Sequence, residues 1–249
     1  MCKAFSGVID RSGKVYWKFA IDSHEDIKKK FSLILKDKAK SDLCPFEIAP
    51  KNGNYLKPDE WVFKFDESCP DWWKASHEKH CWEAYKSWKL KLDKNLIYKE
   101  IIRPFNDVKE VTEVTIEQKA LLKKWDSVWD SVGASVWDSV GASVGASVWD
   151  SVWDSVRDSV RDSVRDSVGA SVGAYTGSFF ALKRSEWKYT EKIKCKGYPF
   201  QSCVDLWEQG LVPSFDGSTW RLHSGKKAKV VFEIKATELR KLKLGDGKA

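Results

Sequence analysis

The pattern of hydrophobic and polar positions in the first part of the chain predicts two strands followed by a helix. Residues 1–10 and 15–20 are rich in β-favouring side chains, and the turn-like segment 11–14 separates them. After Ser23, which with Asp26 resembles a capping box, hydrophobic positions recur at helical spacing. The chain is therefore expected to begin with a β-hairpin and to continue into a helix.

A second helix is expected to begin near Pro70, because proline is tolerated in the first turn of a helix. Its apolar stripe consists of Trp73, His77, Cys81, Tyr85, Trp88 and Leu92. Between the two helices, the prolines and the glycine of residues 44–54 predict irregular chain, and residues 61–65 predict a short strand.

Twelve uninterrupted four-residue units fill residues 125–172. Each unit ends in Ser-Val and begins with Trp-Asp, Arg-Asp or Gly-Ala. Such an array predicts a repeat architecture, in which each unit buries its inner face by stacking on its neighbours. Residues 173–180 look like two degenerate units that close the array.

The period of four argues against one long helix for the array. Four residues of an α-helix advance by about 400°, so a valine stripe drifts by about 40° per unit and circles the helix in about nine units. Val, Ser, Asp, Trp and Gly are also weaker helix formers than Ala or Leu. A β-solenoid with a square coil of about four units per turn would keep every valine inside and leave the variable first two positions exposed.

Helical hairpins are the alternative for the array. The helix that Thr115 and Gln118 open with a second capping box runs into the first unit without a break. Turns between such helices would fall at the glycines Gly133, Gly141, Gly145 and Gly169.

After the array, residues 199–209 predict a helix that Gly210 and Pro213 terminate. Strands are expected at 219–223 and 229–234. The predicted fold class is α+β, with a tetrapeptide-repeat β-solenoid between small α+β caps. Its parts are an N-terminal α+β domain at 1–114, a capping helix at 115–124, the solenoid at 125–180 and a C-terminal α+β cap with a basic tail at 181–249.

The composition is that of a folded protein. With 249 residues, of which 42% are hydrophobic, the chain can bury a sizeable core. It has no run of about 18 apolar residues, no secretory pattern at its start and only six scattered cysteines. We therefore expect reduced thiols, no membrane association and a cytoplasmic location.

Charge is segregated along the chain. The net charge is +7, but eight aspartates against three arginines give the array −5 and leave +12 for the rest. Basic flanks are suited to nucleic acid, although a lysine-rich solvated surface is the ordinary explanation. Nucleic-acid binding through the flanks is therefore an alternative function.

Five of the fourteen tryptophans lie in the array. Stacked at the surface of a solenoid, they would form an apolar patch of the kind that marks an interaction site. The expected partner-binding residues are the array's tryptophans and arginines, namely Trp125, Trp129, Trp137, Trp149, Trp153, Arg157, Arg161 and Arg165. The expected partner is another protein or a second copy of the chain.

Candidate chemistry is sparse, and no cofactor is expected. The Met1-Cys2 start resembles families with an N-terminal cysteine nucleophile, such as class II glutamine amidotransferases and abasic-site-binding SRAP proteins, but Lys3 replaces their usual glycine. An enzyme that uses Cys2 is therefore a second alternative, and an ordinary strand cysteine is the simpler interpretation.

A possible metal-ligand cluster consists of Cys69, His77, His80 and Cys81. His77 and Cys81 would share one helix face, as metal ligands can. Both also lie on the apolar stripe, so core positions are the simpler explanation, and no metal is expected.

Two resemblances complete the interpretation. The array is similar in kind to pentapeptide-repeat solenoids, and the whole chain resembles uncharacterised bacteriophage and metagenomic proteins that combine a Met-Cys-Lys-Ala-Phe start, Ser-Val tetrapeptides and segments like 211–217 and 220–223. The second resemblance implies a variable number of units, no known activity and, if the gene belongs to a phage, a location in the cytoplasm of the host cell. We therefore predict a non-enzymatic module for protein interaction or self-assembly.

Overall fold

The structure is a computed structural model that describes residues 5–19, 21–33, 42–51, 57–140, 142–160 and 162–243, with the side chains of residues 58, 142–144, 146, 147 and 162–167 excepted. The chain forms two compact units. The first combines Met1–Tyr98 with Val140–Val148, and the second combines Lys99–Ser139 with Trp149–Ala249. The first boundary therefore lies before the predicted one at 114, and most of the array shares a unit with the C-terminal part.

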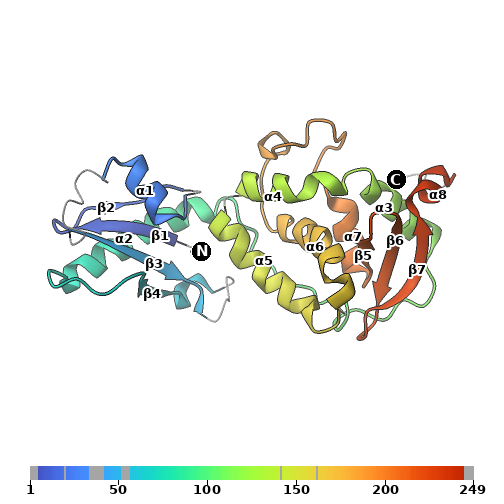
Figure 1. Ribbon diagram of the computed structural model, residues 1–249, viewed down its shortest axis with the longest axis horizontal. Helices are drawn as coiled ribbons and strands as arrows, with labels where there is room; N and C mark the ends of the chain where they lie inside the picture. The colour runs from blue at the N-terminus through green and yellow to red at the C-terminus, as the bar shows by residue number, and fades with distance from the viewer. Residues whose placement is uncertain are drawn as a thin grey trace. The chain divides into compact units, whose positions relative to one another are not determined.

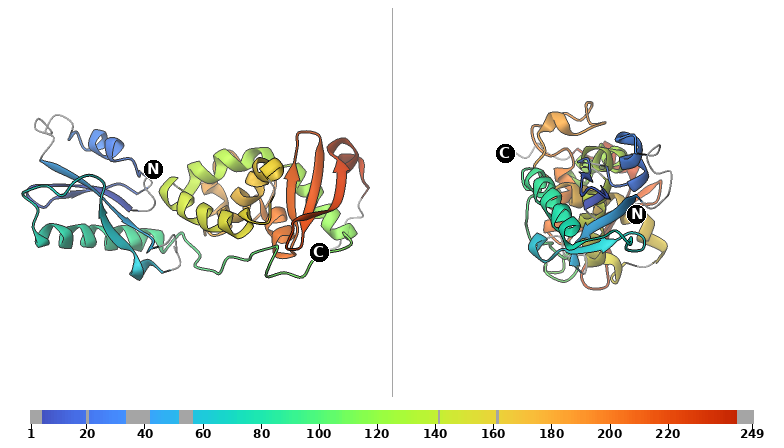
Figure 2. Two further views of the ribbon diagram at one scale, coloured as in Figure 1. Left: turned by 60° about the horizontal axis from the view of Figure 1, so that its bottom comes forward. Right: turned by 90° about the vertical axis from the view of Figure 1, so that its left-hand side faces the viewer.

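The first unit is built on a four-stranded antiparallel sheet (Figure 1). The strands lie in the order β2-β1-β3-β4, with bounds β1 (Phe5–Asp10), β2 (Val15–Tyr16), β3 (Leu43–Ala49) and β4 (Val62–Phe65). Helices α1 (His24–Lys30) and α2 (Ala75–Leu92) lie on opposite faces of this sheet (Figure 2), and a short 3-10 helix, η2 (Pro58–Glu60), precedes β4.

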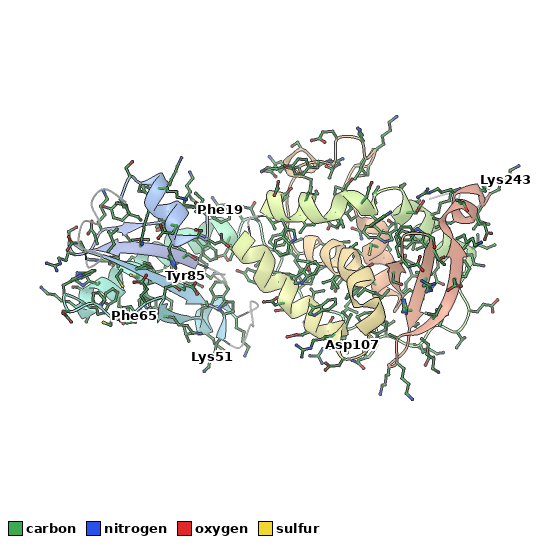
Figure 3. The ribbon with its side chains drawn as sticks, viewed as in Figure 1. Phe19, Lys51, Phe65, Tyr85, Asp107 and Lys243 are labelled. Atoms are coloured by element: carbon green, nitrogen blue, oxygen red, sulfur yellow. The ribbon has the colours of Figure 1, made fainter. Side chains whose placement is uncertain are left out.

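Alternation along the strands divides the core of this unit into two layers. On the α2 side, Phe5 contacts Tyr85, which Figure 3 labels, and Trp88, with ring centroids 5.9 and 5.5 Å away. On the α1 side, Val8 and Leu43 pack with Ile27. Side chains at neighbouring strand positions therefore belong to different layers.

The structure corrects the prediction of irregular chain for residues 44–49, because Leu43–Ala49 form β3, a central strand. Residues 52–54 of that prediction lie outside the described residues. Pro45 argued against a strand, since proline cannot donate to a ladder. The ladder between β3 and β4 covers Phe46 to Ala49, so Pro45 lies just beyond it. The strand therefore tolerates the missing N–H of Pro45, because the ladder to β4 does not include this residue.

The second unit combines helices with a three-stranded antiparallel sheet in the order β5-β6-β7. The strands are β5 (Val212–Phe215), β6 (Thr219–Ser224) and β7 (Lys229–Lys235). Helices α6 and α7 contact β5 (Figure 1). The helices are α3 (Ile116–Asp126), η3 (Trp129–Ser131), α4 (Val132–Val140), α5 (Ala142–Arg157), which is divided between the units, α6 (Asp162–Gly177), η4 (Arg184–Glu186), α7 (Gln201–Glu208) and α8 (Ala236–Lys241).

The predicted β-solenoid is wrong. In the described part of the array, the units form the end of α3, η3, α4, α5 and most of α6, and no strand lies there. The helical alternative describes this region better, but the described glycines do not mark its turns. Gly133, Gly145 and Gly169 lie inside helices, and Gly141 is outside the described residues.

Helices accommodate the period of four because each is short. In α4 and in α5, three described valines spread over about 80° at 40° per unit, which fits within an apolar face about 100° wide. The chain then turns and the stripe starts again. All described valines of the array are consequently buried, namely Val128, Val132, Val136, Val140, Val148, Val152, Val156, Val160, Val168 and Val172.

Several local predictions are confirmed. Ser23 caps α1 by accepting a hydrogen bond from the Asp26 backbone N–H, and Thr115 and Gln118 form the predicted capping box of α3. All members of the predicted stripe that lie within α2 are buried. Helix α7 and the strands β6 and β7 also form where the sequence predicts a helix and two strands.

Buried His223 makes the stability of the protein sensitive to mild acid. Its Nδ1 donates to the Ala228 carbonyl at 3.0 Å, and the Ser214 hydroxyl donates to its Nε2 at 2.7 Å. Burial is the main cause that lowers the pKa of His223 below its usual value of 6.5. The folded protein therefore keeps His223 neutral at pH values where the unfolded chain binds a proton.

We expect the free energy of unfolding to fall as the pH drops below about 6.5, by up to about 1.4 kcal/mol per pH unit, until His223 is protonated in the folded state. Urea unfolding between pH 7.5 and 5.5 measures this slope. His223→Gln should be less stable at pH 7.5 but show a flatter slope. An unchanged slope in that variant would assign the pH dependence to other groups.

Candidate binding pocket in the repeat helices

The five tryptophans of the array occupy different environments. Trp125 is fully buried, with its ring edge-on to Phe200 at a centroid distance of 6.3 Å. It is therefore a core residue rather than part of a binding surface. Trp129, Trp137, Trp149 and Trp153 are half-buried, so only these four present indole surface to a partner.

Three of these four tryptophans line one pocket of about 260 Å³ within the second unit. The ring centroids of Trp137 and Trp149 are 5.8 Å apart, and the angle between the two ring planes is 38°. The remaining lining residues are Trp129, Asp130, Val132, Gly133, Val136, Gly169, Ala170 and Gly173. Almost every lining residue thus belongs to the tetrapeptide array.

The variable first position of the units builds this pocket. Trp129, Trp137 and Trp149 form its sides, and glycine at 133 and 169 leaves the helix surface open. At Gly133 and Gly169 an added Cβ would meet nothing within 4 Å, whereas at Gly173 it would lie 3.1 Å from Cζ3 of Trp149. Glycine at 173 therefore allows Trp149 to approach the helix backbone closely.

The core holds the pocket in place. The ring of Trp129 packs against Phe215 at 5.0 Å and Trp220 at 6.0 Å, both from the C-terminal sheet. Val132 and Val136 are each 2% exposed, so the helix that carries them is anchored on its inner side. The pocket is thus largely formed before any ligand arrives.

The electrostatic character of the pocket favours a cation or an apolar group. Asp130 is exposed and is the one charged residue among the described residues that line the pocket. The face of an indole ring is the negative end of its quadrupole and attracts cations within about 6 Å. An anion would meet both the carboxylate and the ring faces unfavourably.

The other expected partner-binding residues lie outside this pocket. Trp153 is half-buried but does not line it. Arg157 is exposed and pairs with Asp154 at 2.9 Å and with Asp158 at 3.4 Å, contacts that contribute little at a surface. Arg161 and the side chain of Arg165 are outside the described residues.

The structure does not bring the proposed cysteine and histidine cluster together. His77 accepts a hydrogen bond at Nδ1 from the Lys74 backbone N–H at 2.9 Å, and its Nε2 faces the Arg11 carbonyl at 3.3 Å. Nδ1 thus takes part in the N-terminal cap of α2, and Nε2 is engaged by Arg11. Cys69 is exposed and Cys81 is buried, and burial is the main cause that raises the pKa of the Cys81 thiol.

His80 adds no further support for that cluster. Its Nδ1 is buried without a hydrogen-bond partner among the described residues. In the described part of the chain, no three of Cys69, His77, His80 and Cys81 have ligand atoms within 4.8 Å of one another. Cys2, the other chemical candidate, is outside the described residues.

Sequence reasoning missed two polar groupings. Ser214 and His223 resemble a nucleophile and its base, but they are 1% and 3% exposed, so no substrate reaches them. His24, Glu47 and Asp66 bring three potential metal-ligand atoms within 4.8 Å of one another. They come from three separate elements, and no sequence spacing signals their proximity.

Comparison with known proteins adds no information on function: no family model matches, and neither a curated protein nor a solved structure is similar to the chain. None of the helices in the described residues has both the length and the apolar character needed to cross a bilayer.

Proposed function

We propose that this chain is a non-enzymatic protein-binding module whose tryptophan-lined pocket takes a basic side chain, Lys or Arg, from a protein partner. The observation that carries the proposal is the convergence of Trp129, Trp137 and Trp149 on one pocket beside Asp130. Clustered half-buried tryptophans are typical of the anchor sites that dominate protein interfaces.

The size of the pocket supports a side chain as its occupant. Pockets for small molecules usually measure about 300–1,000 Å³, and this one has about 260 Å³. A single long side chain suits such a volume better than a whole cofactor does. The remainder of the partner would then lie against the surface around the opening.

Charge supports a basic occupant. The array carries eight aspartates against three arginines, which gives this segment a net charge of −5. A cation over the face of Trp gains about 0.5–2 kcal/mol, depending on how far it is desolvated. The indole faces and Asp130 would thus act together on a guanidinium or an ammonium group, and the wider acidic segment would attract a basic partner.

An NMR titration of the full-length protein tests this proposal. The probe is a capped pentapeptide that contains one Arg and one Lys, and its control has Gln at both positions. We expect the indole N–H signals of Trp129, Trp137 and Trp149 to shift with the basic peptide, with millimolar or tighter affinity, while buried Trp125 stays unchanged.

Two repeat variants form a matched pair for the titration. Trp149→Ala should weaken peptide binding at least tenfold, whereas Trp153→Ala, at the same position of the next unit but outside the pocket, should change it less than twofold. Equal responses to the basic and the Gln peptide, or equal effects of the two variants, would contradict the proposal. Concentration-dependent shifts without peptide would assign the pocket to a second copy of the chain.

A further inference from the structure

We propose that His24, Glu47 and Asp66 form a binding site for a divalent transition-metal ion such as Zn²⁺ or Mn²⁺. His24 begins α1, Glu47 lies on β3 and Asp66 directly follows β4. One ligand atom from each lies within 4.8 Å of the other two. The site is in the first unit and is independent of the tryptophan-lined pocket.

The hydrogen bonding of His24 supports this assignment. Its Nε2 lies 3.1 Å from the Phe46 carbonyl oxygen, which can only accept, so Nε2 carries a hydrogen. The Nδ1 atom then faces Oδ2 of Asp66 at 3.0 Å, and a carboxylate oxygen is also an acceptor. A neutral imidazole would place two lone pairs against each other, and a bound cation removes this conflict.

This arrangement is the one that metal-binding histidines use. One ring nitrogen coordinates the ion, while the other donates to a backbone carbonyl that fixes the tautomer and the ring orientation. The His24 side chain is 8% exposed, so its ring is also held by its surroundings.

The distances suit an ion. Two ligand atoms about 2.1 Å from a common ion are about 3 Å apart when they subtend a right angle, and His24 Nδ1 and Asp66 Oδ2 are 3.0 Å apart. The three ligand atoms all lie within 4.8 Å of one another, and two ligands on opposite sides of such an ion would be about 4.2 Å apart.

Ser6 provides a second and independent observation. It pairs directly with Glu47 across β1 and β3, so the two side chains share the α1 face of the sheet. Ser6 is 4% exposed, and its buried hydroxyl has no hydrogen-bond partner among the described residues. A metal-bound water, or the ion itself, would satisfy an orphaned hydroxyl at this position.

A pocket beside His24 and Asp66, which Glu47 does not line, favours cations and leaves room for further ligands. It measures about 310 Å³ and is lined by His24 and Asp66 together with Asp22, Ser23, Glu25, Lys28, Pro45 and Glu67. Lys28 is the basic residue in this lining, and it pairs with Glu25 at 3.1 Å. The acidic excess raises the local concentration of cations, and one imidazole with two carboxylates suits Zn²⁺ or Mn²⁺ better than Mg²⁺.

Calorimetric titration of the chelator-treated, tag-free protein with ZnCl₂, MnCl₂ and MgCl₂ tests the proposal. The protein carries Cys69→Ser and Cys195→Ser to remove its exposed described thiols. We expect about one Zn²⁺ or Mn²⁺ per chain and much weaker binding of Mg²⁺. Co²⁺ should give visible absorption bands of an ion bound to nitrogen and oxygen.

Glu47→Gln and His24→Gln should each weaken Zn²⁺ and Mn²⁺ binding at least tenfold, while Glu25→Gln, which lines the adjoining pocket but lies outside the group, should change it less than threefold. Circular dichroism checks that each variant is folded, and Glu47→Gln decides the outcome if His24→Gln is not. Absence of binding in the protein with the two cysteine substitutions, or unchanged affinity in Glu47→Gln, would overturn the site and leave His24 and Asp66 as an ordinary side-chain contact.

Discussion

Asp126→Ala is expected to lower the free energy of unfolding by about 2–4 kcal/mol, because it removes the acceptor at the centre of a buried network. The Asp126 side chain is 3% exposed. It accepts from Nε1 of Trp220 at 2.8 Å and from Nε and Nη2 of Arg240 at 2.7 and 2.9 Å. Guanidinium unfolding at pH 7 measures the change. Most of the loss should come from the buried indole N–H, since Arg240 is 60% exposed and water can solvate it.

The array supplies a matched control for this variant. Asp150 occupies the same position of an identical Trp-Asp-Ser-Val unit but is exposed. Asp150→Ala should therefore change the free energy of unfolding by no more than about 0.5 kcal/mol. Equal losses in the two variants would show that the buried network does not set the cost.

This contrast shows the limit of sequence reasoning for a repeat. Trp125-Asp126 and Trp149-Asp150 are identical in sequence, yet the first pair is buried and the second lies half-buried or exposed. The period of the array predicted that valine lies inside, and every described valine does. The predicted secondary structure of the array was wrong because short helices, each restarting the valine stripe, bury a period of four as well as a solenoid does.

In the flanks, prediction succeeded where the signal is local. Ser23, Thr115 and Gln118 cap helices through contacts three residues apart, which a sequence displays directly. It failed at β3, where Pro45 suggested irregular chain and the ladders to β1 and β4 outweigh that preference. Strand pairing of this kind depends on partners that are distant in sequence.

The two candidate sites also differ in how far the sequence predicts them. The tryptophans of the pocket could be named as binding residues because they are conspicuous in the array, but their convergence depends on how α4, α5 and α6 turn. The group of His24, Glu47 and Asp66 could not be predicted, because the register that places Ser6 opposite Glu47 is a property of the folded sheet. A site whose residues come from separate elements can therefore be recognised only in the folded structure.

Gly177→Ala is expected to destabilise the protein by about 3 kcal/mol, because its Cβ has no room. The added atom would lie 2.0 Å from Oη of Tyr198 and 3.1 Å from Cγ2 of Val136. Tyr198 donates a hydrogen bond to the Ala174 carbonyl at 2.7 Å, and moving its ring would break that bond. The cost combines overpacking with a lost buried hydrogen bond, and urea unfolding measures it.

Gly169→Ala in the same helix should have the opposite effect. Nothing lies within 4 Å of a Cβ at this position, so alanine should stabilise α6 by about 0.5–1 kcal/mol through its higher helix propensity. Because Gly169 lines the tryptophan pocket, the same methyl group should narrow it and weaken binding of the basic peptide. A variant that gains stability while it loses affinity would separate the two roles of glycine in the array, since Gly177 permits packing and Gly169 keeps the pocket open. Loss of stability at Gly169 as large as that at Gly177 would refute this distinction.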